Sequence, residues 1–319
     1  MMGNRLTIAM YHYVRPIAKS RYPGIKGLEY DYFVQQIDFM RRNYNFVSCD
    51  DVRAALAGKA ELPGNAMLLT FDDGYLDHYT YVFPLLARYD IPGFFSMPGK
   101  ILAERKLLDV NKVHFVLASA DAKDLVAYIR ERIDAFRSDF EIPAFDELYA
   151  KYAVANRFDP AEVIFVKRIL QTVLPEPVRN TLTEELFQKY IPVSEDSFVN
   201  ELYMTLDQVR VMAKYGMEFG LHGYDHCWLG NLTQEAMRKD IDMALAFFEG
   251  ILPERGWVMC FPYGSSNPDT VEYVKSRGAG FGFSTEVRVA KLGTDDPYTL
   301  PRLDTNDFPP KSERYKEIK

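Results

Sequence analysis

Short apolar segments alternate along this chain with longer amphipathic ones. The short segments are rich in β-branched and aromatic residues, which is typical of buried strands. The longer segments repeat apolar residues at helical spacing, as Phe33, Ile37 and Met40 do within Tyr32–Asn43. The other predicted helices of this pattern are Tyr75–Tyr89 and Gln234–Gly250, and the predicted strands are Leu6–Tyr13, Met67–Phe71, Gly93–Met97, Glu218–Leu221, Trp257–Phe261 and Gly280–Ser284.

The order of these elements predicts the fold class. Strands that alternate with helices usually lie parallel and are joined by right-handed crossovers. We therefore expect an α/β protein. An open sheet and a barrel both fit this pattern.

The segment from residue 100 to residue 200 departs from the alternation. It has few strand signals, and its helical patterns lie at Ala122–Phe136, Pro160–Val173 and Glu176–Tyr190. We interpret residues 100–200 as a helical insertion into a single domain of residues 1–308. Residues 309–319 are predicted to form a charged tail.

Composition narrows the functional classes. The chain is 48% apolar and 26% charged, so it can bury a sizeable core. Its formal charge of −7 gives it no overall attraction for nucleic acid or anionic membranes. The N-terminal apolar run is short and is interrupted at Tyr11, His12 and Tyr13, and no stretch approaches the roughly 18 apolar residues of a membrane span. We therefore expect no transmembrane segment and a cytoplasmic protein.

Two adjacent carboxylates, Asp72 and Asp73, follow the predicted strand Met67–Phe71 and precede Gly74. In α/β proteins the ends of such strands build the functional face. One carboxylate can bind a metal ion while its neighbour accepts a proton. Taken alone, however, Asp-Asp-Gly is more typical of a helix cap.

Two histidines, His222 and His226, follow the predicted strand Glu218–Leu221. A spacing of four can present both rings to one ion if the segment turns helically. The alternative is one capping and one surface histidine. Asp225 between them is either a further ligand or a solvated loop residue.

A third strand end continues from Cys260 and Phe261 into Pro262, Tyr263 and Gly264. Proline and glycine fix a loop and let the backbone approach a ligand closely. A backbone N–H here can therefore face a developing oxyanion. By itself this segment is also an ordinary turn, but the three strand ends together are far more specific than any one of them.

Taken together, these motifs resemble those of the NodB-homology polysaccharide deacetylases, carbohydrate esterase family 4. The resemblance covers about residues 5–100 and 201–305 and leaves the helical segment outside. It implies a distorted (β/α) barrel with fewer than eight strands. It also implies a divalent metal ion, most often Zn2+, held by one Asp and two His.

The resemblance assigns roles by position. Asp73, His222 and His226 would bind the metal ion. Asp72 would act as the general base, and Tyr263 would offer its backbone N–H to the tetrahedral intermediate.

The sequence departs from the family pattern at two positions near the motifs. Gly223 stands where most members have Ser or Thr after the first histidine. Cys260 stands where many members carry an arginine that orients the base. Arg302, after a predicted last strand, is our candidate for that arginine, and the alternative for it is a surface salt bridge.

A third departure concerns the general acid. The family usually has a late histidine that protonates the leaving amine, and no histidine follows His226. His12, at the end of the first strand, is our candidate, because barrel strand ends converge on one face. Otherwise His12 only packs and water at the metal ion delivers the proton. His78 and His114 are expected to lie outside the site.

These observations predict a metal-dependent hydrolase that removes an N-acyl group, acetyl or formyl, from an amino sugar. A cytoplasmic location favours a nucleotide-linked, lipid-linked or oligosaccharide substrate over mature wall polymer. One alternative is a non-catalytic sugar-binding or scaffold protein of the same fold, which the missing late histidine keeps open. A remote alternative is a non-heme iron oxygenase, because two histidines and one carboxylate are also its ligand set.

Overall fold

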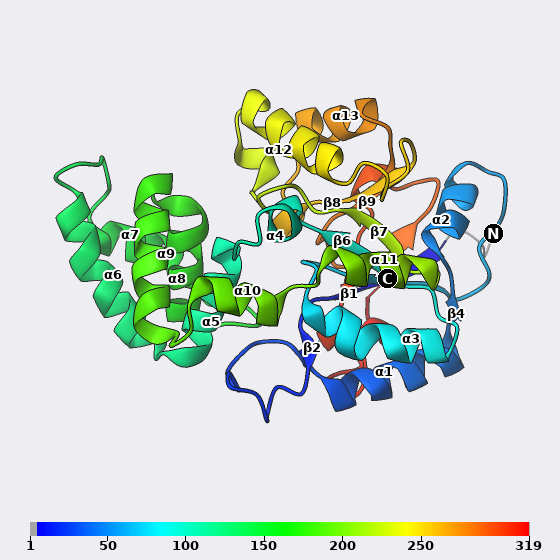
Figure 1. The fold of residues 1–319 in the computed structure, drawn as a ribbon, viewed down its shortest axis with the longest axis horizontal. Coiled ribbons are helices and arrows are strands. Elements are labelled where there is room, and N and C mark those ends of the chain that lie inside the picture. Colours follow the sequence, from blue (N-terminus) through cyan, green and yellow to red (C-terminus); the bar gives the residue numbers. More distant parts are fainter. Residues whose placement is uncertain (1–4, 319) are drawn as a thin grey trace. The chain divides into compact units, whose positions relative to one another are not determined.

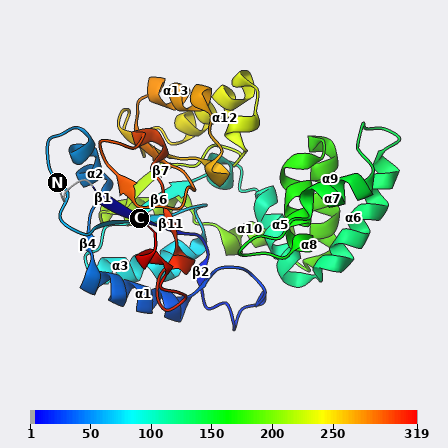
Figure 2. The same ribbon diagram turned by 180° about the vertical axis from the view of Figure 1, so that it is seen from behind.

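The computed structural model describes residues 5–318, so residues 1–4 of the predicted domain and residue 319 of the predicted tail lie outside it. The chain forms two compact units (Figure 1, Figure 2). The first unit contains the described residues up to Pro16, Gly27–Lys106 and the described residues from Val199 onward. The second unit contains Ile17–Lys26 and Leu107–Phe198.

A nine-stranded sheet forms the centre of the first unit, as far as the chain is described. Its main run is parallel, in the order β1-β5-β6-β7-β8-β9, and β10 joins β1 antiparallel. Two short strands, β4 and β11, pair with β5 and β1, while β2 and β3 pair separately. The strands are β1 (Arg5–Tyr11), β2 (Val14–Arg15), β3 (Leu28–Glu29), β4 (Asn45–Phe46), β5 (Ala66–Phe71), β6 (Phe94–Met97), β7 (Glu218–Leu221), β8 (Trp257–Cys260), β9 (Ala279–Phe283), β10 (Ala290–Lys291) and β11 (Leu303–Asp304).

The segment from Leu300 to Asp304 connects the two ends of the parallel run. Leu300 forms a parallel bridge with Phe283 of β9, and Leu303 of β11 pairs with Ala9 of β1. The sheet therefore curls round toward itself, with this segment in place of a further full strand. The α/β fold and the distorted (β/α) barrel predicted from the sequence are confirmed.

Helices of the first unit cover the sheet, with α1 and α3 on one side and α12 and α13 on the other (Figure 1). The apolar stripe of α1, Phe33, Ile37 and Met40, is buried as its spacing predicts. The predicted helix Tyr75–Tyr89 is divided into a π-helical turn, η1, and α3. The helices are α1 (Tyr30–Asn43), α2 (Cys49–Leu56), η1 (His78–Val82), α3 (Phe83–Arg88), α4 (Gly99–Ala103), α11 (Leu206–Lys214), α12 (Gln234–Phe247) and α13 (Pro268–Ser276), and the short 3-10 turns are η3 (Leu229–Asn231), η4 (Pro262–Gly264), η5 (Pro297–Thr299), η6 (Thr305–Asp307) and η7 (Arg314–Lys316).

The second unit is helical, with no strand among its described residues. Residues 17–26, which the sequence analysis did not assign to it, join this unit through Tyr22, whose ring meets Phe115 edge-on at 5.0 Å between centroids. No helix in the described part of the chain has the length and apolarity to cross a bilayer. The helices are α5 (Asp109–Ser119), α6 (Ala122–Phe136), α7 (Phe145–Tyr152), α8 (Ala161–Arg168), η2 (Ile169–Val173), α9 (Glu176–Tyr190) and α10 (Glu195–Leu202), the last of which continues into the first unit.

Candidate active site at the strand ends

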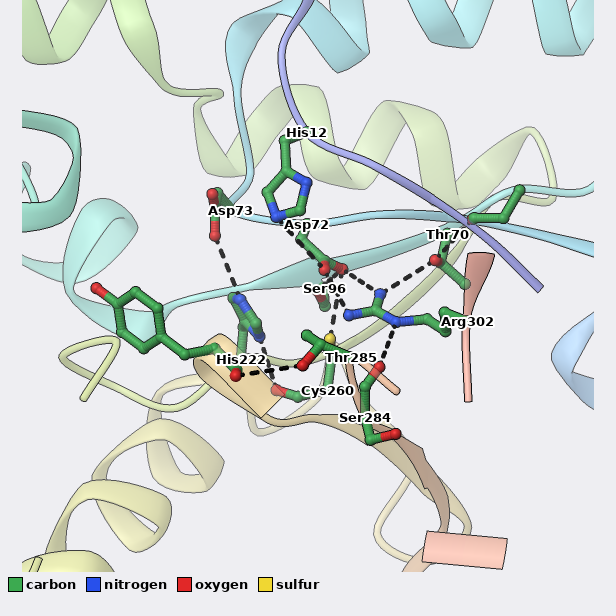
Figure 3. A network of polar contacts seen from close by, with 12 residues as sticks. His12, Thr70, Asp72, Asp73, Ser96, His222, Cys260, Ser284, Thr285 and Arg302 are labelled. Carbon is green, nitrogen blue, oxygen red and sulfur yellow. Dashed lines mark hydrogen bonds and ion pairs between the residues drawn. The ribbon is translucent and has the colours of Figure 1, made fainter. Parts of the chain in front are cut away.

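The carboxyl ends of the parallel strands carry a cluster of polar side chains (Figure 3). Alternate residues of a strand face the same side of the sheet. In β5 and β6 one such row begins in the apolar core with Leu68 and Phe94. Two residues further on, the rows present Thr70 and Ser96, and the β5 row continues to Asp72. Along β5 and β6 the interior of the barrel therefore changes from an apolar core to a polar site.

Arg302 holds the carboxylate of Asp72 at two points. Nη1 donates to Oδ1 at 3.0 Å and Nη2 lies 2.9 Å from Oδ2, with both side chains 1% exposed. Nε of the same guanidinium donates to the Ser284 carbonyl at 3.0 Å, and Nη1 also reaches Thr70 Oγ1 at 3.1 Å (Figure 3). A planar two-point contact fixes the carboxylate plane. Arg302 therefore contacts Asp72 inside the site and does not form a surface salt bridge.

Two further side chains approach Oδ1 of Asp72. Ser96 Oγ donates to it at 2.7 Å, and Cys260 Sγ lies 3.4 Å away. Burial by itself would raise the pKa of the Asp72 carboxyl, but the charges of Arg302, His222 and His12 outweigh it and lower that pKa below its ordinary value. Asp72 is therefore ionised. Ser96 was not among the predicted site residues, although a hydroxyl within an apolar strand was a usable signal.

Asp73, His222 and His226 converge on one point. The Nε2 atoms of His222 and His226 lie 3.3 and 3.2 Å from Oδ1 of Asp73. All three side chains are buried, and their candidate ligand atoms lie within 4.8 Å of one another. Two imidazoles and one carboxylate occur as the protein ligands of catalytic zinc sites, which keep a further position open.

The unsatisfied atoms of this cluster fit a divalent cation. Oδ1 of Asp73 is buried and accepts no hydrogen bond of normal geometry from the described residues. Nδ1 of His222 lies 2.7 Å from the Cys260 carbonyl, so Nδ1 carries a proton and Nε2 faces Asp73. Burial lowers the pKa of His222, but its interactions with Cys260 and Asp73 outweigh burial and raise that pKa well above its ordinary value, so a metal ion would displace a proton from Nε2. Burial lowers the pKa of His226, which favours the neutral form that binds metals.

The loop between the two histidines is shaped by Asp240 of α12. Its carboxylate accepts the backbone N–H groups of Tyr224 and Asp225, both at 2.9 Å. Gly223 has a φ of 70°, and a Cβ there would meet Oδ1 of Asp240 at 2.8 Å. The positive φ and the nearby Asp240 carboxylate therefore favour glycine at this position. Asp225 is exposed and pairs with Lys100, so it points away from the candidate metal ligands.

Tyr263 lies beside the cluster in a strained backbone conformation. Its φ of 58° is in the left-handed region, which residues with a side chain rarely adopt. The Tyr263 ring meets His226 edge-on at 4.7 Å and stacks on Trp228 at 4.4 Å between centroids. Thr285 Oγ1 donates to the Tyr263 carbonyl at 3.4 Å. These contacts hold the turn that the sequence analysis assigned to the oxyanion.

His12 faces Asp72 from the end of β1. Tyr11 is paired with Phe71 across β1 and β5, so the two following residues are neighbours. Nε2 of His12 lies 3.9 Å from Oδ2 of Asp72, and the histidine side chain is 41% exposed. His78, which we expected outside the site, lies directly behind it with Nε2 2.9 Å from the His12 carbonyl oxygen.

Tyr75 contacts the second oxygen of Asp73. Its hydroxyl donates to Oδ2 at 2.6 Å. Burial, followed by the charge of Asp73, raises the pKa of Tyr75 well above its ordinary value, so the phenol stays protonated. Tyr75 was not among the predicted site residues, although it directly follows the Asp-Asp-Gly motif.

The sequence of this chain is similar to those of known polysaccharide deacetylases. The polysaccharide deacetylase family model matches residues 59–131 and 182–281, more than half of the chain. A stretch of 66 residues is 41% identical to the poly-beta-1,6-N-acetyl-D-glucosamine N-deacetylase of Escherichia coli (strain K12). That match covers 20% of this chain and only 10% of the relative.

Two solved structures have a similar fold. The Streptococcus pyogenes deacetylase PplD in complex with acetate is 16% identical, with a TM-score of 0.58 over 98% of this chain and 96% of that one. IcaB from Ammonifex degensii is 20% identical, with a TM-score of 0.59 over 99% of each chain. At these identities the likeness concerns the fold.

The matched residues include the three main motifs on which the resemblance was based, whereas His12 and Arg302 lie outside them. Asp72 and Asp73 fall in the first matched segment, and His222, His226 and Tyr263 fall in the second. The structure brings these two segments together at one end of a single barrel. This chain belongs to the polysaccharide deacetylase family.

Proposed function

We propose that this protein is a divalent-metal-dependent hydrolase that removes an N-acetyl or N-formyl group from an amino sugar. The proposal rests on the convergence of Asp73, His222 and His226 beside the ionised carboxylate of Asp72. These three residues would hold the ion, and Zn2+ is the first candidate because it favours such nitrogen and oxygen ligands. When bound, the ion supplies Lewis-acid polarisation of the amide carbonyl and of the attacking water.

Asp72 is the proposed general base. Ser96, Cys260 and Arg302 all approach Oδ1, whereas Oδ2 contacts Arg302 at 2.9 Å and faces His12 at 3.9 Å. Oδ2 is therefore the less crowded oxygen and the better placed to accept a proton from water. The water adds to the carbonyl carbon as that proton leaves. The backbone N–H of Tyr263 is the proposed donor to the oxyanion that forms.

His12 is the proposed general acid. It protonates the leaving nitrogen as the C–N bond breaks, so the products are a free amine and acetate or formate. Its position 3.9 Å from Asp72 favours an enzyme over a non-catalytic sugar-binding or scaffold protein. Membership of a deacetylase family favours hydrolysis over the oxygenase alternative.

Oligomers of β-1,6-linked N-acetylglucosamine are the first substrates to test. The support for them is the name of the E. coli relative that shares the 66-residue stretch. Nucleotide-linked and lipid-linked N-acyl amino sugars form the second set, which a cytoplasmic location would favour.

The test is release of acetate or formate by the zinc-loaded protein and by Asp72→Asn. Asparagine keeps the size and one oxygen acceptor but is not a base. We therefore expect zinc binding to persist and product release to fall by at least about a hundredfold. Release of acetate or formate that does not depend on Asp72 would contradict the proposal. So would a protein that binds zinc but releases neither product from any of these substrates.

A further inference from the structure

We infer that Tyr75 is a positioning residue for the metal ion, which holds Oδ2 of Asp73 so that only Oδ1 faces His222 and His226. The inference rests on the metal-dependent function proposed above. It concerns a side chain that does not itself face the ion.

The two oxygens of Asp73 have different surroundings. Oδ1 lies 3.3 and 3.2 Å from the two histidine Nε2 atoms. Oδ2 accepts the Tyr75 hydroxyl at 2.6 Å, a distance typical of a phenol donating to an ionised carboxylate. Tyr75 is 0% and Asp73 3% exposed, so water does not compete for this contact.

The direction of the Tyr75 hydroxyl is fixed by packing. Its ring stacks against Tyr13 at 4.1 Å and 21° and against Tyr203 at 6.2 Å and 9°. His78 meets the same ring edge-on at 5.6 Å. These aromatic neighbours are all buried, so the ring cannot swing away from Asp73 when an ion binds or leaves.

The backbone around Tyr75 is held as well. Asp73 and Gly74 both have positive φ angles, 77° and 67°. The Gly74 carbonyl accepts the N–H of Met204 at 3.0 Å, and Tyr75 forms an antiparallel bridge with Tyr203. The Asp73 carboxylate and the Tyr75 phenol therefore lie on one turn, which the backbone contacts with Tyr203 and Met204 hold in place.

This arrangement has a consequence for coordination. A carboxylate free to rotate can offer two oxygens to an ion, whereas one held through Oδ2 offers a single ligand atom. With two histidines the protein then supplies three ligands and leaves positions for water and substrate. Hydrogen bonds to ligating carboxylates commonly change metal affinity by about tenfold to hundredfold.

Tyr75→Phe tests the inference, since it keeps the ring and removes only the hydroxyl. Tyr203→Phe is the matched control, because it makes the same change in a neighbouring ring. Zinc affinity is measured on the chelator-stripped full chain by competition with a chromophoric chelator. We expect the Kd of Tyr75→Phe to rise about tenfold to hundredfold and that of Tyr203→Phe to stay close to the wild-type value.

A second measurement uses the wild-type protein alone. The infrared difference spectrum between zinc-loaded and stripped protein reports the splitting of the carboxylate stretching bands, which is wide when a carboxylate binds through one oxygen. We expect the wide splitting. A narrow splitting typical of two-oxygen binding overturns the inference even if Tyr75→Phe does not fold.

The outcomes separate this inference from the proposed function. Wild-type protein that binds no zinc overturns the metal assignment, and the inference with it. Wild-type protein that binds zinc with the same affinity as folded Tyr75→Phe overturns the inference alone.

Discussion

Arg302 and Asp72 form a two-point ion pair almost wholly removed from water. The guanidinium nitrogens lie 3.0 and 2.9 Å from the two carboxylate oxygens, and each side chain is 1% exposed. Either charge alone would be costly to bury, because the interior solvates ions poorly. The same pair therefore supports both the fold and the proposed base.

Replacing Arg302 by Met leaves the Asp72 carboxylate buried without its cation. We expect the free energy of unfolding, measured with urea near neutral pH, to fall by about 3–5 kcal/mol. Deacetylation should also be lost, because Asp72 is no longer oriented. Arg210→Met, which removes an exposed partner of Asp207, should change stability little. Wild-type stability in Arg302→Met would show that the buried pair is not needed.

His78 links stability to pH. Burial lowers its pKa from 6.5 to about 4, so the folded protein keeps it neutral where the unfolded chain binds a proton. The pKa of His78 is lower in the folded protein than in the unfolded chain. The contribution of neutral His78 to the free energy of unfolding is therefore fully present above pH 6.5 and is lost as the pH falls toward 4.

The change in the His78 contribution should reach about 2–3 kcal/mol. It is measured as the difference in unfolding free energy between neutral and mildly acidic solution, compared with His78→Gln. The glutamine can still reach the His12 carbonyl but does not titrate in this range. An identical pH dependence in both proteins would contradict the assignment.

His12→Gln should affect the breaking of the amide bond more than substrate binding. We expect kcat on an N-acetylated sugar to fall by about a hundredfold or more while KM changes little. An activated ester, whose leaving group departs without a proton, should lose far less. His114→Gln, in the second unit, is the control. Equal losses on amide and ester would argue against His12 as the acid.

Gly223→Ser adds a side chain to the loop between the two histidines, and we expect it to harm this chain. The positive φ and the contact of a Cβ with Asp240 should together cost about 1–3 kcal/mol. Zinc affinity should also weaken, because the loop carries His222 and His226. Gly58→Ser has a similar φ of 66° with nothing within 4 Å of the added Cβ, so it isolates the backbone cost. Equal stabilities of the two variants would exclude a specific role for Asp240.

Most of the fold could be predicted from hydrophobic periodicity. The six predicted strands match β1, β5, β6, β7, β8 and β9 within two residues at each end. The strands β2, β3, β4, β10 and β11 have two residues each, too few to show alternation. These short strands are defined by the neighbouring strands with which they pair. Contacts in the folded protein likewise place residues 17–26 in the second unit.

The site was predictable only in part. Strand ends that carry Asp, His and Tyr could be found in the sequence, because parallel strands bring their carboxyl ends to one edge. The contributions of Ser96, Tyr75 and Asp240 depend on distances across elements. The local sequence carries a signal for Ser96, within an apolar strand, and for Tyr75, after Asp-Asp-Gly, but none for Asp240 on its helix. The metal ion, the site roles and the cytoplasmic location stay predictions.

The segment Leu300–Asp304 has a consequence for how the protein matures. It joins β9 to β1 and carries Arg302 into the site. Until it docks, the barrel is unclosed and the proposed base has no counter-charge. Closure of the barrel and placement of the counter-charge for the proposed base therefore depend on the same segment, and we expect a chain in which this segment is undocked to lack amidase activity.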